Sequence, residues 1–264
     1  MPQPNQITQS QLSRLIGLPD APTLIDVRLP EDLARDPRLI PGSFALPHTQ
    51  CDPFSLKSRR VVVICARGRK LSEGVAALLR LQGIAAEVLE GGAGGWAEAG
   101  LPMVPVAALP KSNLWVTRHR PKIDRVACPW LIRRFIDPGA RFLYVAPSEV
   151  LAVAERFDAT PFDIEGVAYS HRGDTCTFDT MLAKWGLRTP ALQRLALVIR
   201  AADTDQHDLS PQAAGLLAIS VGLSRQYRDD LEQLAIGLTL YDALYRWARD
   251  GQDETHDWPA GSPA

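Results

Sequence analysis

The amino-acid sequence predicts two folded parts: an α/β part with a parallel sheet covered by helices on both faces, then a mostly helical α+β part. In the first part, short apolar segments rich in β-branched residues alternate with helical patterns, which is typical of a parallel sheet. Residues 101–113 interrupt this pattern with three prolines and no charge before Lys111. Helical patterns then dominate toward the end of the chain. We therefore divide the chain into residues 1–104, a linker at 105–113, a second domain at 114–250 and a polar tail at 251–264.

The pattern of apolar and capping residues in the first part indicates three buried strands and two helices. The strands are expected at residues 23–27, 60–65 and 85–89. Thr8 can cap a helix over residues 9–16, and Gly17 can end it. A second helix is expected over residues 72–81. Residues 90–95 contain so many glycines that we expect only a turn or loop there.

The second part combines short strands with longer helices. Strands are expected at residues 114–117 and 141–145, with a further one within 163–171. Helical patterns occur at residues 124–136, 147–156, 178–185, 190–202, 211–223 and 229–249. Thr177 can cap the third of these helices, and Gly186 can end it. Pro129 has to lie in the first turns of its helix, or it kinks that helix.

Composition and charge argue against several classes of protein. The 264 residues are 46% hydrophobic and carry a formal net charge of −1, which gives no overall attraction to nucleic acid or anionic membranes. The four cysteines lie far apart without a CxxC pair, which indicates a reducing compartment rather than a disulfide framework. The N-terminus lacks the pattern of a signal peptide, and no apolar stretch approaches the ~20 residues that span a bilayer. We expect a cytoplasmic protein without membrane contact.

Cys65 is the main candidate for catalysis. It ends a predicted strand and is followed by the loop Ala66-Arg67-Gly68-Arg69-Lys70 and then a helix. Backbone N–H groups in such a loop point into its centre, the helix dipole adds positive potential, and the basic side chains add formal charge. These effects favour the thiolate, which is the nucleophile, and they suit an anionic sulfur donor such as thiosulfate. Gly68 allows a backbone conformation that other residues resist.

The chemistry expected of this loop is covalent sulfur transfer in two steps. The Cys65 thiolate attacks the outer sulfur of a donor and becomes a persulfide, which then passes its sulfur to a second nucleophile. No metal or organic cofactor is required in this domain. The structural alternative is that Cys65 is a small core residue, because a cysteine that ends an apolar strand more often packs than reacts.

Four motifs in the first part occur in the order of a known family. They are LIDVR at residues 24–28, IPGS at 40–43 with ALPH at 45–48, CARGRK at 65–70 and EGGAGGW at 90–96. With them, residues 8–104 resemble the rhodanese family, which implies a thiosulfate sulfurtransferase-like enzyme with a thiol or cyanide as acceptor. The resemblance implies that Cys65 carries the persulfide and that Arg28 and residues 66–70 belong to the substrate site, with Arg28 mainly structural beside Asp26. One departure is Leu71, an extra residue before Ser72 that can shift the start of the helix.

Residues 114–141 are strongly basic, with seven Arg or Lys residues against two Asp residues. Arginine binds oxyanions through two parallel hydrogen bonds, so Arg118 and Arg125 are candidates for oxyanion binding. The same charge equally fits a solvated face, or pairing with acidic residues of the same domain. No helix-turn-helix or RNA-binding motif is visible, so we expect no nucleic acid partner.

A second group of polar residues surrounds His171. Candidate ligands of a divalent metal are His171, Asp179, Glu165 and Asp203, because imidazole and carboxylate groups commonly bind such ions. Their spacing matches no strong zinc motif. Structural roles are the alternative: Asp174 can stabilise a turn, and Asp179 can lie in the first turn of a helix, where its charge suits the dipole.

Four segments of the second part match another family. They are WVTRHRPKIDRVACPWLIRRFID at residues 115–137, FDIEGVAYSHRGDTCTFD at 162–179, AADTD at 201–205 and AAGLLAISVGLS at 213–224. With them, residues 114–249 resemble the ChrB-type C-terminal domain of chromate-resistance proteins, which implies a role in bacterial chromate resistance and makes chromate a candidate ligand. Some relatives carry a DNA-binding part in front of this domain. The rhodanese-like part in that place argues against direct transcriptional control.

Two hypotheses for the function remain open. In the first, the protein is a sulfurtransferase whose second domain links it to chromate resistance. In the second, the second domain is a sensor that binds chromate or a metal, and the rhodanese-like domain is a scaffold or redox sensor. Direct reduction of chromate has little support, because no dinucleotide or flavin fingerprint occurs.

Overall fold

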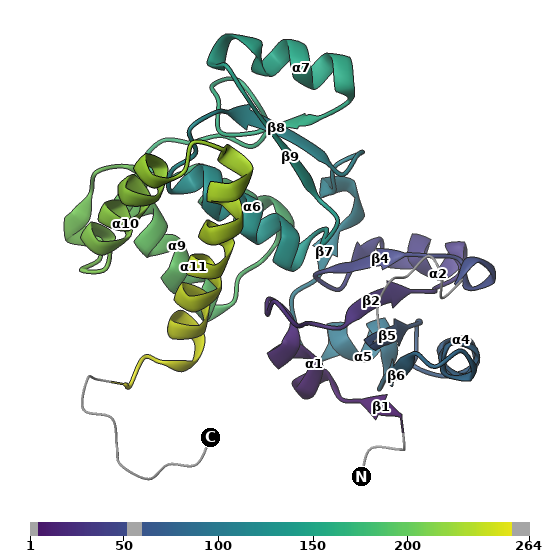
Figure 1. The fold of residues 1–264 in the computed structure, drawn as a ribbon. Coiled ribbons are helices and arrows are strands. Elements are labelled where there is room, and N and C mark those ends of the chain that lie inside the picture. The colour runs from purple at the N-terminus through teal and green to yellow at the C-terminus, as the bar shows by residue number, and fades with distance from the viewer. Residues whose placement is uncertain (1–4, 52–59, 255–264) are drawn as a thin grey trace.

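The computed structural model describes residues 5–51 and 60–254. Its first part is built around a five-stranded parallel sheet with strand order β1-β6-β5-β2-β4 (Figure 1). The strands are β1 (Gln6–Ile7), β2 (Thr23–Asp26), β4 (Ser43–Ala45), β5 (Arg60–Ile64) and β6 (Ala85–Leu89). The α/β class expected from the alternating pattern is confirmed.

Helices cover both faces of this sheet, because its central strands are apolar on both sides. On one face, Val61 and Val63 of β5 pack with α4 (Lys70–Leu81). On the other face, Val62 and Ile64 share a core with α1 (Gln9–Leu15), which Thr8 caps, and α5 (Gly92–Glu98). The alternation along β5 follows from the two-residue period of a strand. This packing holds the carboxyl end of β5 close to the start of α4.

Helix α5 corrects the expectation that residues 90–95 form only a turn or loop. Gly91 and Gly92 have φ angles of +70° and +60°, so they make the left-handed turn that leads into the helix. Ala93 and Trp96 are then buried in the core beside the sheet. This burial outweighs the weak helix propensity of the glycines.

The Pro-rich segment predicted as a linker is anchored at both ends. It starts in β7 (Val104–Pro105), which pairs antiparallel with β3 (Arg38–Leu39) just beyond α2 (Pro30–Arg35). It continues as the 3-10 turn η2 (Val106–Ala108). The Ala108 carbonyl accepts hydrogen bonds from the Tyr169 hydroxyl (2.8 Å) and the Trp185 indole (3.1 Å). The segment is therefore tied to the second part through two aromatic side chains.

The second part contains a three-stranded parallel sheet and a group of helices. The sheet has the order β10-β8-β9, with β8 (Leu114–Arg118), β9 (Arg141–Val145) and β10 (Thr160–Pro161). The helices are α6 (Asp124–Phe135), α7 (Val150–Phe157), α8 (Thr177–Trp185), α9 (Pro190–Asp203), α10 (Ala213–Gln226) and α11 (Asp230–Asp250). The mostly helical α+β class is confirmed. None of the described helices combines the length and the hydrophobicity that a bilayer-spanning segment needs.

Several local boundaries differ from the sequence-based expectations. Helix α4 begins at Lys70 rather than at residue 72. Helix α7 begins at Val150 after the 3-10 turn η3 (Pro147–Glu149), rather than at residue 147. Residues 163–171 form no strand, and Tyr169 makes only an isolated bridge with Phe162. The cap of α8 is Cys176 rather than Thr177, because the Asp179 carboxylate accepts a hydrogen bond from the Cys176 N–H.

Pro129 lies inside α6, and the helix continues through it. A proline has no N–H, so the carbonyl of Arg125, four residues earlier, lacks its usual helical partner. The hydroxyl of Tyr144, on β9, donates a hydrogen bond to this carbonyl (3.0 Å). The adjacent strand thus satisfies the acceptor that the proline leaves open.

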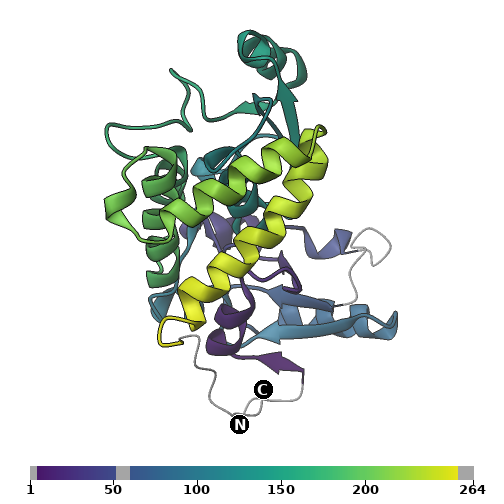
Figure 2. The same ribbon diagram turned by 60° about the vertical axis from the view of Figure 1, so that its left-hand side comes forward.

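The two parts pack on each other through one continuous apolar core. Leu12 and Trp96 of the first part belong to the same buried cluster as Phe135 and Tyr245 of the second. Figure 2 shows α11 running diagonally toward α1, and Arg249 near its end donates a hydrogen bond to the Arg14 carbonyl (2.9 Å). A cavity of about 770 Å³ lies along this contact and is lined by residues of both parts.

Candidate functional site

Cys65 follows β5 directly and is 7% exposed. Its Sγ lies 3.1 Å from the hydroxyl oxygen of Ser72 and 3.4 Å from the carbonyl oxygen of Arg69. The start of α5 holds the loop, because the N–H groups of Ala93 and Gly94 donate hydrogen bonds to the carbonyls of Cys65 and Ala66. The thiol is therefore held between the start of α4 and the start of α5.

The surroundings of Cys65 favour its thiolate. Burial raises the pKa of this thiol, but hydrogen bonds from the Ser72 hydroxyl and from the N–H groups of Ser72, Arg67 and Arg69 lower it more. The pKa of Cys65 therefore lies below the 9.0 of a free thiol. Donors that converge on a sulfur anion are the feature that the sequence predicted for this loop.

The residues predicted to line the substrate site border two surface cavities. A cavity of about 480 Å³ is lined by Arg28, Ala66, Arg67 and Arg69 among others. A neighbouring cavity of about 710 Å³ is lined by Arg67, Gly68, Arg69 and Lys70 among others. The side chains of Arg67, Arg69 and Lys70 are exposed at the loop. The loop thus presents positive charge to a small anion.

Arg28 lies beside the first cavity but is held by other groups. Its side chain is 3% exposed and pairs with Asp26 at 2.8 Å. It also donates hydrogen bonds to the carbonyls of Asp36 and Arg38. These contacts fix the loop after β2, in keeping with the mainly structural role expected from the sequence.

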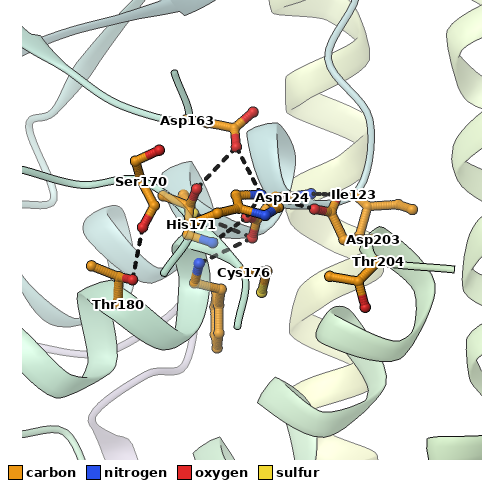
Figure 3. A network of polar contacts seen from close by, with 12 residues as sticks. Ile123, Asp124, Asp163, Ser170, His171, Cys176, Thr180, Asp203 and Thr204 are labelled. Carbon is orange, nitrogen blue, oxygen red and sulfur yellow. Dashed lines mark hydrogen bonds and ion pairs between the residues drawn. The ribbon is translucent and has the colours of Figure 1, made fainter. Parts of the chain in front are cut away.

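A second polar site lies in the other part of the chain, around the imidazole of His171 (Figure 3). His171 Nε2 lies 3.4 Å from Asp124 Oδ2, 3.3 Å from Asp163 Oδ1 and 3.2 Å from Asp203 Oδ2. Asp124 is the first residue of α6, Asp203 is the last residue of α9, and Asp163 and His171 lie on the segment between β10 and α8. We call these four residues the His/Asp cluster.

Neighbouring donors fix the carboxylates of the His/Asp cluster. Asp124 accepts hydrogen bonds from the N–H groups of Thr177 (2.6 Å) and Phe178 (3.1 Å) at the start of α8. Asp163 Oδ2 pairs with Arg118 (2.9 Å) and Arg125 (3.3 Å). Arg118 and Arg125 thus pair with an acidic residue of their own domain, which is one of the alternatives that the sequence left open.

Hydrogen bonds and charges within the His/Asp cluster shift the pKa values of its members. Hydrogen bonds to Asp124 and Asp163 raise the pKa of His171 to about 10. Burial, together with the charges of Asp124 and Asp163, raises the pKa of Asp203 to about 7. Burial also acts on Asp163, but its hydrogen bonds with His171, Arg118 and Thr177 leave the pKa of that carboxyl lowered. Negative charge is therefore concentrated around the imidazole.

The structure places the four metal-ligand candidates in two groups. His171 and Asp203 lie together, as described above. Asp179 instead accepts a hydrogen bond from Cys176 N–H (3.1 Å) and pairs with Arg200 (3.6 Å), and it lies in the first turn of α8, as its structural alternative predicted. Glu165 is exposed on its loop. Neither of these two belongs to the group with ligand-like geometry, which consists of Asp124, Asp163 and His171 among the described residues.

The sequence predicted neither Asp124 nor Asp163 as a metal ligand. Asp124 belongs to the basic stretch of residues 114–141, far from His171 in the chain. The available signal was an acidic residue at the predicted start of a buried helix, where its carboxylate can face a neighbouring helix end.

Comparison with known proteins gives matches for both parts of the chain. A model of the ChrB C-terminal domain matches residues 115–248, and a model of the rhodanese-like domain matches residues 8–99. Protein ChrB of Cupriavidus metallidurans is 38% identical over 133 residues, which are 50% of this chain and 39% of that protein. The match thus spans about two fifths of the curated relative.

Several solved structures are similar to a portion of this chain. A rhodanese-related protein from Thermoplasma volcanium is 28% identical with a TM-score of 0.33, covering 38% of this chain and 97% of that one. A rhodanese-like domain protein from Staphylococcus aureus is 30% identical with a TM-score of 0.29, and the match covers 35% of this chain and 90% of that one. A thiosulfate sulfurtransferase from Pseudomonas aeruginosa is 22% identical with a TM-score of 0.33, and the match covers 39% of this chain and 20% of that one.

Proposed function

The chain belongs to the family of the ChrB C-terminal domain and carries a rhodanese-like domain in front of it, and on this basis we propose that it is a sulfurtransferase that acts through a Cys65 persulfide in bacterial chromate resistance. The observation that carries the proposal is the Cys65 thiol itself. Its pKa is lowered by hydrogen bonds from Ser72 and the loop N–H groups, and arginine side chains border the cavities beside it. A thiolate in such a loop is a nucleophile.

The proposed reaction has two displacement steps. The Cys65 thiolate attacks the outer sulfur of thiosulfate, so a new S–S bond forms while the donor S–S bond breaks and sulfite leaves with the electron pair. An acceptor such as cyanide or a thiolate then attacks the outer sulfur of the persulfide, and Cys65 leaves as the thiolate. The N–H groups of Arg67, Arg69 and Ser72 support the negative charge on Cys65 at the start and end of this cycle.

The link to chromate rests on the second domain and on the chemistry of the anion. Chromate resembles sulfate in shape and charge, and it oxidises thiols. A domain that handles sulfane sulfur would act on the same thiol stress that chromate causes. The shared core of the two parts supports a common role, because the domains are not independent modules on a loose tether.

A second candidate function is a binding or sensing role. The His/Asp cluster favours it, because converging imidazole and carboxylate groups bind metal ions. In this alternative the rhodanese-like domain serves as a scaffold or redox sensor. The two functions differ in whether Cys65 takes part in repeated catalytic cycles of sulfur transfer.

The deciding experiment measures thiocyanate production from thiosulfate and cyanide. We expect activity in the wild type and a loss of more than about a hundredfold in Cys65→Ser, because a serine hydroxyl is a poor nucleophile for sulfur. Cys51→Ser is the matched control, since Cys51 is a second partly buried thiol of the same domain. Full activity in Cys65→Ser would refute the proposal, and inactivity of a folded wild type with reduced Cys65 would favour the sensing role.

A further inference from the structure

We propose that Asp124, Asp163 and His171 form a binding site for a divalent metal ion of the Mn²⁺ or Fe²⁺ kind, with Asp203 as a neighbouring carboxylate that adds negative charge. The site lies in the second domain, and the inference does not rest on sulfur transfer at Cys65. A failure of one proposal would therefore leave the other unaffected.

The positions of the ligand atoms carry this proposal. One ligand atom each from Asp124, Asp163 and His171 lies within 4.8 Å of the other two. His171 Nε2 is also 3.2 Å from an Asp203 oxygen, so a further carboxylate lies against the imidazole although it is outside this group of three (Figure 3). Ligands that bind one metal ion at about 2.1 Å lie roughly 3 Å from each other. The observed separations of 3.3–3.4 Å between the imidazole nitrogen and the Asp163 and Asp124 oxygens match this spacing.

The imidazole distinguishes this site from an ordinary acidic surface cluster. His171 supplies a nitrogen ligand, and its side chain is 40% exposed, so an ion can enter from solvent on its side. The carboxylates behind it are withdrawn from water, with side-chain exposures of 1% for Asp124 and 5% for Asp163. Buried carboxylates are costly unless they are paired or bind a metal.

Asp203 is an unfavourable residue for its place in the fold. It is the last residue of α9, where the helix dipole is negative and a carboxylate is destabilising. Its Oδ2 nevertheless faces the other carboxylates around His171. A bound cation offsets both the dipole and the repulsion among the three carboxylates.

The residues around the cluster hydrogen-bond to its ligand side chains and orient them, as neighbours of the ligands commonly do in metal sites. Arg118 and Arg125 hold Asp163 Oδ2, while Asp163 Oδ1 faces His171 and accepts a hydrogen bond from the Thr177 hydroxyl. The Phe178 N–H holds Asp124 Oδ1, while Asp124 Oδ2 faces His171 and accepts a hydrogen bond from the Thr177 N–H. Each of these two oxygens keeps a further lone pair for a cation.

The ligand chemistry indicates which metal fits. Two carboxylates and one imidazole, with a third carboxylate beside them, suit a hard or borderline ion rather than a soft one. The nearby thiols of Cys128 and Cys176 face carboxylate oxygens and do not belong to the ligand group. Mn²⁺ is therefore the probe that matches the site.

The test titrates Mn²⁺ into the full chain after treatment with EDTA, by calorimetry and by electron paramagnetic resonance. We expect one Mn²⁺ per chain, with a nitrogen coupling from the imidazole in electron spin echo spectra. His171→Ala is expected to remove the nitrogen coupling and weaken binding at least about tenfold, a loss of roughly 1.4 kcal/mol. Asp203→Asn, which keeps the size of the side chain, is expected to weaken binding as well.

Glu165→Gln is the matched control, because Glu165 is an exposed carboxylate on the same segment and outside the cluster. It is expected to bind Mn²⁺ like the wild type. Absence of saturable binding in the wild type would overturn the proposal and leave the cluster as an ion-pair network around a protonated imidazole. Equal binding by the wild type and both cluster variants would overturn it too.

Discussion

At the scale of single residues, Ser72 is the side chain that contributes most to lowering the pKa of Cys65. It is fully buried, its Oγ lies 3.1 Å from Cys65 Sγ, and it also donates a hydrogen bond to the Arg69 carbonyl. The serine hydroxyl rotates, so it can donate a hydrogen bond to the Cys65 thiolate or accept one from the Cys65 thiol.

We expect Ser72→Ala to raise the pKa of Cys65. The folded protein loses the side-chain hydrogen bond that favours the thiolate, while burial of the thiol still opposes ionisation. Alkylation by iodoacetamide as a function of pH measures this: the midpoint for wild type lies below 9.0 and moves to higher pH in the variant. Cys51 is a built-in control, because burial raises its pKa and it should react only at higher pH. An unchanged midpoint would exclude Ser72 as the donor.

The two sites differ in how far the sequence could reveal them. The Cys65 loop is contiguous, so its charge, glycine and cysteine are visible in six residues. The His/Asp cluster is assembled from α6, α9 and the segment between β10 and α8. Asp124 and Asp203 meet His171 only through tertiary packing, and neither their spacing nor their neighbours in the chain encode that contact.

At the scale of secondary-structure elements, α5 and the Cys65 loop are fitted to each other. A Cβ added at Gly92 would collide with the Cys65 carbonyl and approach the N–H of Arg67 (2.8 Å). The sequence could show that Gly92 lies in a glycine-rich stretch, but not that a second loop would approach it so closely. This contact explains why α5 begins with a glycine at residue 92.

Gly92→Ala is therefore expected to lower the free energy of unfolding by roughly 1–3 kcal/mol, through overpacking and its positive φ. Because the displaced group is the Cys65 carbonyl, alkylation of the thiol should also change. Gly74→Ala is the control: Gly74 lies exposed within α4 with no atom near its Cβ position, and alanine there should stabilise by about 0.5–1 kcal/mol. Urea unfolding measures both, and equal effects would contradict the close fit.

Helix α6 depends on a hydrogen bond from outside the helix. Tyr144→Phe removes the donor to the Arg125 carbonyl and is expected to cost about 1 kcal/mol. In a Pro129→Ala background, the restored N–H can donate to that carbonyl instead, so the same substitution should cost less. A double-mutant cycle from denaturant unfolding measures the coupling. Equal costs in the two backgrounds would show that the tyrosine does not compensate for the proline.

At the scale of the whole molecule, one continuous apolar core joins the two parts. Phe135 of α6 contacts the aromatic rings of Trp130 and Tyr245, and a Cβ at Gly17 of the first part would collide with it. The sequence indicated the division at the Pro-rich segment but not this packing, because the residues that meet lie far apart in the chain.

We expect a single cooperative thermal transition by calorimetry, with Phe135→Ala lowering its midpoint through a loss of about 3–5 kcal/mol. Leu81→Ala is the control, since Leu81 is 83% exposed and its truncation should leave the midpoint nearly unchanged. Two separated transitions, with only one of them moved by Phe135→Ala, would mean that the parts fold independently.

The carbonyl of Ala108 accepts hydrogen bonds from both Tyr169 and Trp185, so the segment that joins the two parts is fastened rather than hinged. These two hydrogen bonds hold the joining segment against the second part. For the sulfurtransferase proposed above, the acceptor then has to reach Cys65 by diffusion, because the joining segment is not built as a hinge that carries one domain onto the other.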